Sequence, residues 1–215
     1  MDIRSIILSI PGLVVGVSFH EFAHALAADR LGDPTPRMEG RLTLEPWMHF
    51  DIVGTVLLLL YGFGWAKPVH VNPFNFRRPK RDMLLVALAG PLMNLAVAVG
   101  CWMVVILLSV VHSGELLLQV LRICASINIG LAAFNILPVP PLDGSKVLSL
   151  VRSPRMEQIL QALETYGPLL LLLLLISGRI GSLIGGIASF FARITFSLAA
   201  TALNPLLNLI TRWWG

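Results

Sequence analysis

The stretch FHEFAHALAADRLGD (residues 19–33) places His20, Glu21 and His24 near the end of a strongly apolar segment. Residues four apart in a helix differ by about 40° around its axis, so the two histidines share one face. Two imidazoles so arranged can bind one metal ion, and the glutamate can reach a water molecule on that ion. A surface helix could carry these residues without a function. Ionisable side chains within an apolar run are costly and mostly functional, so the pattern predicts a metal site.

The composition indicates an integral membrane protein. The chain is 56% hydrophobic and 13% charged, with a mean hydropathy of +0.80, whereas soluble domains have about 25% charged residues. The basic residues that raise the pI to about 9.6 lie between apolar segments. There they favour a role in membrane orientation and contact with anionic lipid head groups, and nucleic acid is not expected as a partner. Cys101 and Cys124 are isolated packing residues with no expected disulfide.

Apolar segments long enough to cross about 30 Å of hydrocarbon recur along the chain. The first is interpreted as a retained span, because cleavage as a signal peptide would remove or strand the histidine motif. Residues 51–61 are too short to cross, and Gly, Pro and Asn punctuate residues 62–82. The expected spans are residues 3–28, 83–111, 116–137, 158–176 and 182–210.

A third metal ligand is expected in NILPVPPLDGSKV, directly after an apolar span. Tetrahedral zinc bound by two histidines and a water molecule leaves one position, which a carboxylate or a third histidine usually fills. Asp143 suits this role because three prolines break the helix before it, and Gly144 allows close backbone approach. The alternative is that Asp143 caps a helix over residues 145–150, which does not exclude a ligand role.

Four motifs together resemble the site-2 protease family of intramembrane zinc metalloproteases. HEFAH (residues 20–24) matches its HExxH signature, and NILPVPPLDG (residues 135–144) matches its NxxPxxxxDG signature. WAKPV (residues 65–69) and AGPLMN (residues 89–94) match further family segments. The resemblance covers residues 1 to about 150 and favours the minimal prokaryotic form, without a PDZ or CBS domain.

The resemblance implies a role for each motif residue. His20, His24 and Asp143 would bind one Zn2+ per chain, and Glu21 would be the catalytic base. Asn135 would hold the scissile carbonyl or its oxyanion, although an asparagine before a proline break can instead satisfy freed backbone groups. The implied activity is that of an intramembrane endopeptidase, cutting peptide bonds in or near transmembrane segments of other membrane proteins.

The implied fold is all-α and polytopic, with about five transmembrane helices and a re-entrant helix and β-hairpin between the first two. We expect a single membrane-embedded peptidase domain (1–215), with a catalytic core over about 1–150 and C-terminal helices over about 156–212. Residues 51–61 would form a short re-entrant helix and residues 62–71 the hairpin. The hairpin's edge would bind unwound substrate, or the segment would be a plain interfacial loop. The candidate substrate-binding residues are Trp65, Ala66, Lys67, Pro68, Val69 and Asn94.

Three polar residues outside the signatures have alternative interpretations. Asn94 could bond across helices or stabilise packing instead of binding substrate. His49 and Asp51 are interpreted as a solvated turn, with a supporting role beside the metal as the alternative.

The two signatures also constrain membrane topology. Both lie near the C-terminal end of a span, so those spans must run parallel, with residues 83–111 antiparallel between them. Residues 51–82 then make no net crossing, and most Lys and Arg residues fall on the side of the metal site. Because Lys/Arg excess marks the cytoplasm, we predict a multi-pass prokaryotic plasma-membrane protein whose active site faces the cytoplasm.

Two other functions fit a membrane metal site. A zinc transporter or sensor would bind the ion without hydrolysis, but it would need a chain of relay sites and would leave Glu21 without a role. A catalytically inactive membrane chaperone would not need an intact set of ligands.

Overall fold

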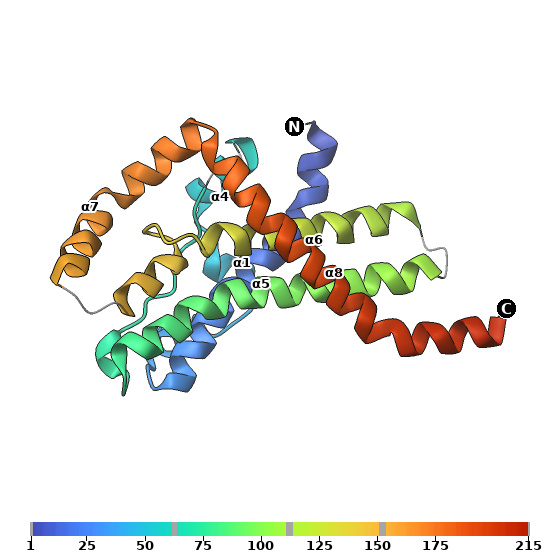
Figure 1. Cartoon of the computed structure of the whole chain (residues 1–215), viewed down its shortest axis with the longest axis horizontal. Helices are drawn as coiled ribbons and strands as arrows, with labels where there is room; N and C mark the ends of the chain where they lie inside the picture. The colour runs from blue at the N-terminus through green and yellow to red at the C-terminus, as the bar shows by residue number, and fades with distance from the viewer. Residues whose placement is uncertain (1, 62–63, 111–113, 151–153, 215) are drawn as a thin grey trace.

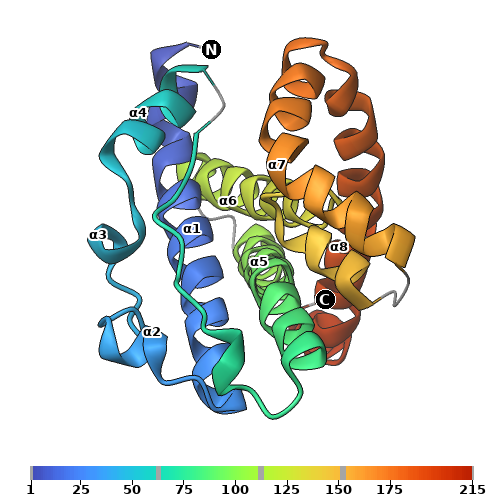
Figure 2. The same ribbon diagram turned by 90° about the vertical axis from the view of Figure 1, so that its left-hand side faces the viewer.

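The computed structural model describes residues 2–61, 64–110, 114–150 and 154–214 of the chain. Long helices dominate it, and short helices lie along one side (Figures 1 and 2). The elements are α1 (Ile3–Leu31), α2 (Thr35–Met38), α3 (Pro46–His49), α4 (Ile52–Tyr61), η1 (Pro73–Asn75), α5 (Pro79–Val110), α6 (Glu115–Asn135), η2 (Asp143–Leu150), α7 (Pro154–Ile176) and α8 (Arg179–Trp214).

Five of these helices, α1, α5, α6, α7 and α8, are long and apolar enough to cross a membrane. This confirms the predicted all-α polytopic fold. Their ends follow from local sequence: Gly32 ends α1 with a φ of 110°, a left-handed conformation that favours glycine. Helix α5 begins at Pro79, earlier than the expected residue 83, because proline is tolerated in a first turn. The Asp82 side chain also accepts a hydrogen bond from the Arg78 N–H (3.0 Å) there.

Helices α1, α5 and α6 form a closely packed frame. A Cβ atom added at Gly12 of α1 would lie 2.8 Å from Cys124 Cα of α6, so the two backbones nearly touch. Between α5 and α6, the fully buried alanines Ala98 and Ala125 lie in one cluster. Small residues allow such close approach where the bilayer supplies no hydrophobic drive for helix association.

The directions of the three frame helices agree with the predicted topology. Gly16 lies against Asn128 one turn beyond the Gly12–Cys124 contact, so α1 and α6 run parallel. Asn94 of α5 bonds to Gly16, whereas the earlier Val86 bonds to the later His24, so α5 runs antiparallel to α1. The two signature motifs are therefore brought to the same end of the frame.

Helices α7 and α8 pack on the outside of this frame. Leu171 of α7 and Ile180 of α8 form a buried cluster with Leu137 and Leu142 of the segment after α6. Further along α8, Phe196 contacts Trp102 of α5 edge to face, with ring centroids 5.5 Å apart. The C-terminal pair thus supports the segment that carries the second signature.

The predicted re-entrant hairpin is not formed by the described residues. Helix α4 is present, but residues 64–72 (the extended segment) make one isolated antiparallel bridge, Phe50 to Ala66, in place of a ladder. The segment instead runs alongside α1 between α4 and η1 (Figure 2). Pro68 lacks a donor for a ladder, and the N–H groups of Val69 and Asn72 bond to side chains near α1.

Candidate metal centre

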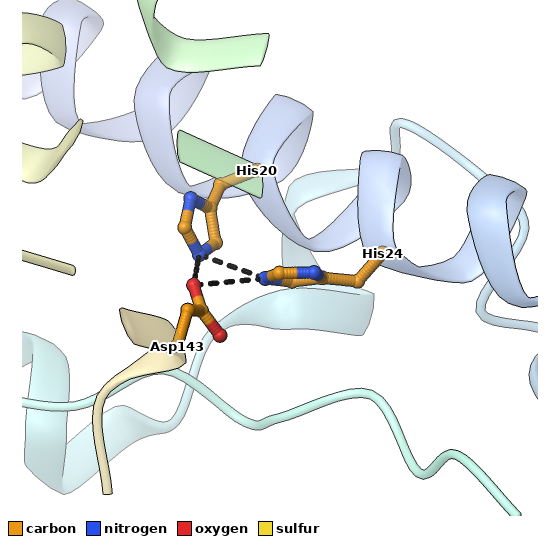
Figure 3. A group of neighbouring side chains, drawn as sticks. All are labelled: His20, His24 and Asp143. Atoms are coloured by element: carbon orange, nitrogen blue, oxygen red, sulfur yellow. Dashed lines mark hydrogen bonds and ion pairs between the residues drawn. The ribbon is translucent and has the colours of Figure 1, made fainter. Parts of the chain in front are cut away.

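The two histidines of the first signature project from one face of α1 near its C-terminal end (Figure 3). Both are buried, and their Nε2 atoms lie 3.0 Å apart. Their rings meet edge to face with centroids 4.6 Å apart. The i, i+4 spacing read from the sequence thus converges two imidazole nitrogens on one point.

Asp143 meets the histidines from the segment that follows α6 (Figure 3). Its Oδ2 lies 3.1 Å from His20 Nε2 and 3.2 Å from His24 Nε2. The backbone turn that brings it there depends on Gly144, where a Cβ would lie 2.6 Å from the Leu137 carbonyl oxygen. The predicted close approach at Gly144 is confirmed, and residues 119 positions apart form one group.

The outer nitrogens of both imidazoles are held by hydrogen bonds. His24 Nδ1 lies 2.8 Å from the Val86 carbonyl oxygen, which can only accept. His20 Nδ1 lies 2.6 Å from Asn94 Oδ1. Asn94 Nδ2 donates to the Gly16 carbonyl (2.9 Å) and to Asn128 Oδ1 (3.0 Å), so its Oδ1 is left to accept. Each Nδ1 therefore carries a hydrogen, and each ring in its neutral form presents the Nε2 lone pair inward.

This arrangement fits a metal cation. With both rings neutral, as metal ligands have to be, two Nε2 lone pairs face Asp143 Oδ2, a buried side-chain oxygen. Their separations of 3.0–3.2 Å are close to the edge of about 3.3 Å of a tetrahedron with metal–ligand bonds of about 2.0–2.1 Å. Two imidazoles and one carboxylate suit zinc and leave a fourth position for water or substrate.

The metal centre also depends on Gly90 of α5, which sequence reasoning did not single out. A Cβ atom there would collide with the His24 ring nitrogen and would lie 2.6 Å from His20 Cε1. Any side chain would occupy the space of the imidazoles. Gly90 belongs to the AGPLMN segment, but nothing in that local pattern shows which helix it will face.

Glu21 directly follows His20 in the sequence, and its side chain is buried. Its hydrogen bond is to the extended segment. Its Oε2 accepts a hydrogen bond from the backbone N–H of Val69 (3.1 Å). This contact brings WAKPV (residues 65–69) to the predicted catalytic base. The Val69 donor, expected at an open strand edge, is thereby occupied.

The two candidate site asparagines, Asn94 and Asn135, differ in burial and in hydrogen-bond partners. Asn94 is fully buried and bonds to His20, Gly16 and Asn128, so it is not open to a substrate in this structure. Asn135 is the last residue of α6 and is half-buried, and its Nδ2 donates to the Leu131 carbonyl of its own helix (3.0 Å). The second N–H of that amide remains for another acceptor.

The interpretation of residues 49–51 as a solvated turn is wrong for His49. This side chain is 0% exposed, and its Nε2 lies 2.7 Å from the Thr43 carbonyl oxygen. Asp51 caps α4 by accepting the Gly54 N–H (2.8 Å). Neither side chain belongs to the metal centre, because the described residues that converge there are His20, His24 and Asp143.

Comparison with known proteins shows which family the chain resembles in sequence. The sequence model of peptidase family M50 matches residues 108–175. YwhC of Bacillus subtilis is 38% identical over 173 residues, covering 77% of this chain and 78% of YwhC. A Methanocaldococcus jannaschii relative is 32% identical over 142 residues, covering 66% and 69% of the two chains. Rip2 of Mycobacterium tuberculosis is 28% identical over 223 residues, covering 97% and 81%.

All three relatives are named as candidate zinc metalloproteases. No solved structure matches the chain significantly. The identity with YwhC over most of both chains, together with the matched family model, shows that this chain belongs to peptidase family M50, the site-2 protease family.

Proposed function

We propose that His20, His24 and Asp143 bind one zinc ion and that Glu21 is the catalytic base of peptide-bond hydrolysis within the membrane. The chain is a multi-pass membrane protein and a zinc-dependent intramembrane protease, in line with its family. The observation that carries the assignment of the ligands is the convergence of His20 Nε2, His24 Nε2 and Asp143 Oδ2, spaced 3.0–3.2 Å apart, while both Nδ1 atoms face carbonyl oxygens outside this group.

Zinc, when bound, supplies a Lewis acid that activates water and polarises the scissile carbonyl. The carboxylate of Glu21 is not needed as a metal ligand, so it is available as a base. Glu21 takes a proton from the attacking water and returns it to the leaving amine. The free N–H of Asn135 donates to the oxyanion that develops on the substrate carbonyl. Loss of such a donor typically costs about 10²- to 10³-fold in rate.

The substrates are transmembrane segments of other membrane proteins, which have to unwind before a backbone carbonyl can reach the site. Residues 65–69 are the candidate substrate-binding segment, because the Val69 N–H donates to Glu21 Oε2 (N···O 3.1 Å). Trp65 and Lys67, both exposed, lie on the same segment. A substrate chain bound at Glu21 would therefore lie beside this segment.

A zinc transporter or sensor is the competing function, and reconstitution separates the two. The purified chain in liposomes is expected to cleave a co-reconstituted transmembrane substrate, to stop when a chelator removes zinc, and to resume when zinc is restored. Zinc uptake into the same liposomes is measured in parallel. Zinc uptake without cleavage would replace the protease proposal, and cleavage that persists in the fully metal-free protein would remove zinc from the reaction.

We also propose that the site faces the cytoplasm, from the distribution of positive charge. The topology predicted from the sequence assigns to the side of the metal site Arg30, Arg37, Arg41, Lys67, Arg77, Arg78, Lys80, Arg81, Lys146, Arg152 and Arg155, against Arg4 and Arg179 opposite, with Arg122 nearby. Pro79→Cys, in a chain with Cys101→Ala and Cys124→Ala, is expected to react with a membrane-impermeant thiol reagent only after the cells are opened. Labelling in intact cells would reverse the orientation.

A further inference from the structure

The extended segment is fixed at its first end by a buried support. The Lys67 N–H donates to the His49 carbonyl oxygen (2.8 Å), next to the bridge between Phe50 and Ala66. His49 is itself fully buried and bonded to the Thr43 carbonyl. The backbone of Lys67 is therefore fixed by a hydrogen bond to the buried residue His49.

A buried carboxylate fixes the other end of the segment. Asp33, directly after α1, is 0% exposed. Its Oδ2 accepts the Asn72 N–H (2.7 Å), and its Oδ1 accepts from Asn75 Nδ2 (2.7 Å) and from the hydroxyl of Thr35 (2.6 Å). Hydrogen bonds to an ionised group are the stronger kind. The segment is thus tied to the same helix that carries the metal motif.

Between these two ends, one backbone group reaches the active site. The Val69 N–H donates to Glu21 Oε2 (3.1 Å), two residues after Lys67 and three before Asn72. Pro68 restricts the backbone just before this donor. In the described part of the chain Glu21 Oε1 has no hydrogen-bond partner, which leaves that oxygen for the proton-transfer step.

We propose that the backbone amide of Val69 is a positioning group that orients the Glu21 carboxylate toward the scissile bond. The two ends of the extended segment set where that amide lies. The inference rests on the proposed role of Glu21 as the base. It explains why a segment without a strand ladder is nevertheless fixed at both ends, at His49 and at Asp33. A carboxylate with one oxygen fixed keeps the other in a single direction.

The sharpest test deletes only this donor. Replacing Val69 by its α-hydroxy acid converts the N–H to an ester oxygen and keeps the isopropyl side chain. The same building block at Val71 is the matched control, because no hydrogen bond from the Val71 N–H is found within the described residues. Cleavage of a transmembrane substrate and zinc content are measured on the same purified proteins, beside the unmodified chain.

The ester at position 69 is expected to lower kcat at least about tenfold, the usual effect of losing a hydrogen bond to a charged group. KM and zinc content should stay near those of the unmodified chain, and the ester at position 71 should change none of the three. An unchanged kcat would overturn the inference. A raised KM with unchanged kcat would also overturn it, because the Val69 amide would then bind substrate and not Glu21. An unmodified, zinc-loaded chain that cleaves no transmembrane substrate would instead reject the proposed function itself.

A second pair of variants tests the anchor at Asp33. Asn75→Ala and Thr35→Val each remove one side-chain hydrogen bond to the same oxygen, Oδ1. Only Asn75 belongs to the part of the chain that continues the extended segment. The inference therefore expects a larger fall in kcat for Asn75→Ala at equal zinc content. Equal effects of the two variants would show that the anchor does not act on Glu21 through the segment.

Discussion

The frame of α1, α5 and α6 differs sharply from the α7–α8 pair in what it buries. The candidate membrane spans of α1 and α6 are 44% and 39% buried, whereas those of α7 and α8 are 11% buried each. In the frame, Asn94 and Asn128 are fully buried and bond across three helices. In α7 and α8, the buried polar side chain among the described residues is Thr195, which bonds within its own helix.

The difference shows that the polar side chains buried at membrane depth and bonded between helices are concentrated in the frame. An unsatisfied polar group costs several kcal/mol in hydrocarbon, so each has to find a partner inside the protein. In the frame these partners form a chain from Asn128 through Asn94 to His20, and the chain ends at the metal centre. The α7–α8 pair has no comparable network in the described residues and supports the frame by apolar packing.

The largest expected effect comes from a single methyl group at the centre of the frame. Gly90→Ala should abolish zinc binding and cleavage, because the added Cβ occupies the space of both imidazoles. Zinc per chain and cleavage rate are measured on purified protein. Gly100→Ala in the same helix and Gly185→Ala in α8 are the controls, since a Cβ at either meets nothing within 4 Å. If Gly90→Ala keeps normal zinc content, the described packing around the histidines is wrong.

A smaller effect is expected from the buried polar network. Asn94→Leu leaves His20 Nδ1 without its acceptor, and loss of such an outer partner typically weakens metal affinity by about 10- to 100-fold. Thr195→Val removes an equally buried polar group that bonds only to Phe191 and Ala192 of its own helix. Its zinc affinity should not change. Competition with a zinc chelator measures both variants, and equal affinities would contradict the contrast between the two regions.

The smallest effect concerns the acid dependence of stability at Asp33, outside the membrane spans. Burial raises the pKa of this carboxyl, but the hydrogen bonds from Thr35, Asn75 and Asn72 outweigh burial and hold it below the usual 3.8. The stabilisation is therefore present above pH about 4 and is lost as the pH falls through the lowered pKa. Asp33→Asn should lower Tm by about 2–4 °C at pH 7. This difference from the unmodified chain should shrink toward pH 3, and a gap that widens in acid would reject the assignment.

The features that local sequence encodes were predictable. The i, i+4 spacing of His20 and His24 and the proline break before Asp143 each restrict the backbone directly. Their expected meeting on one metal required the two spans to run parallel, and α1 and α6 do so. The apolar lengths of the five long helices likewise depend on composition alone.

The features that depend on distant partners were not predictable from one sequence. Gly90 matters because of two imidazoles on another helix, and Asp33 because of Asn72 and Asn75 on a later segment. Over the described residues 64–71 the hairpin prediction was wrong, because a short window does not show that the Lys67 N–H bonds to the His49 carbonyl and the Val69 N–H to the Glu21 side chain instead of to a second strand. Residues 62–63 of the predicted hairpin lie outside the described residues. His49 looked like a turn residue because local polarity does not report burial.

The central claim is that this end of the frame holds zinc through His20, His24 and Asp143 while Glu21 performs the proton transfers. The most direct measurement is zinc content and cleavage of a transmembrane substrate on one purified sample of Glu21→Gln, which keeps the size of the side chain and removes its charge. The account predicts about one zinc ion per chain, as in the unmodified protein, and no detectable cleavage. Zinc-loaded Glu21→Gln that cleaves at a rate near that of the unmodified protein would contradict it.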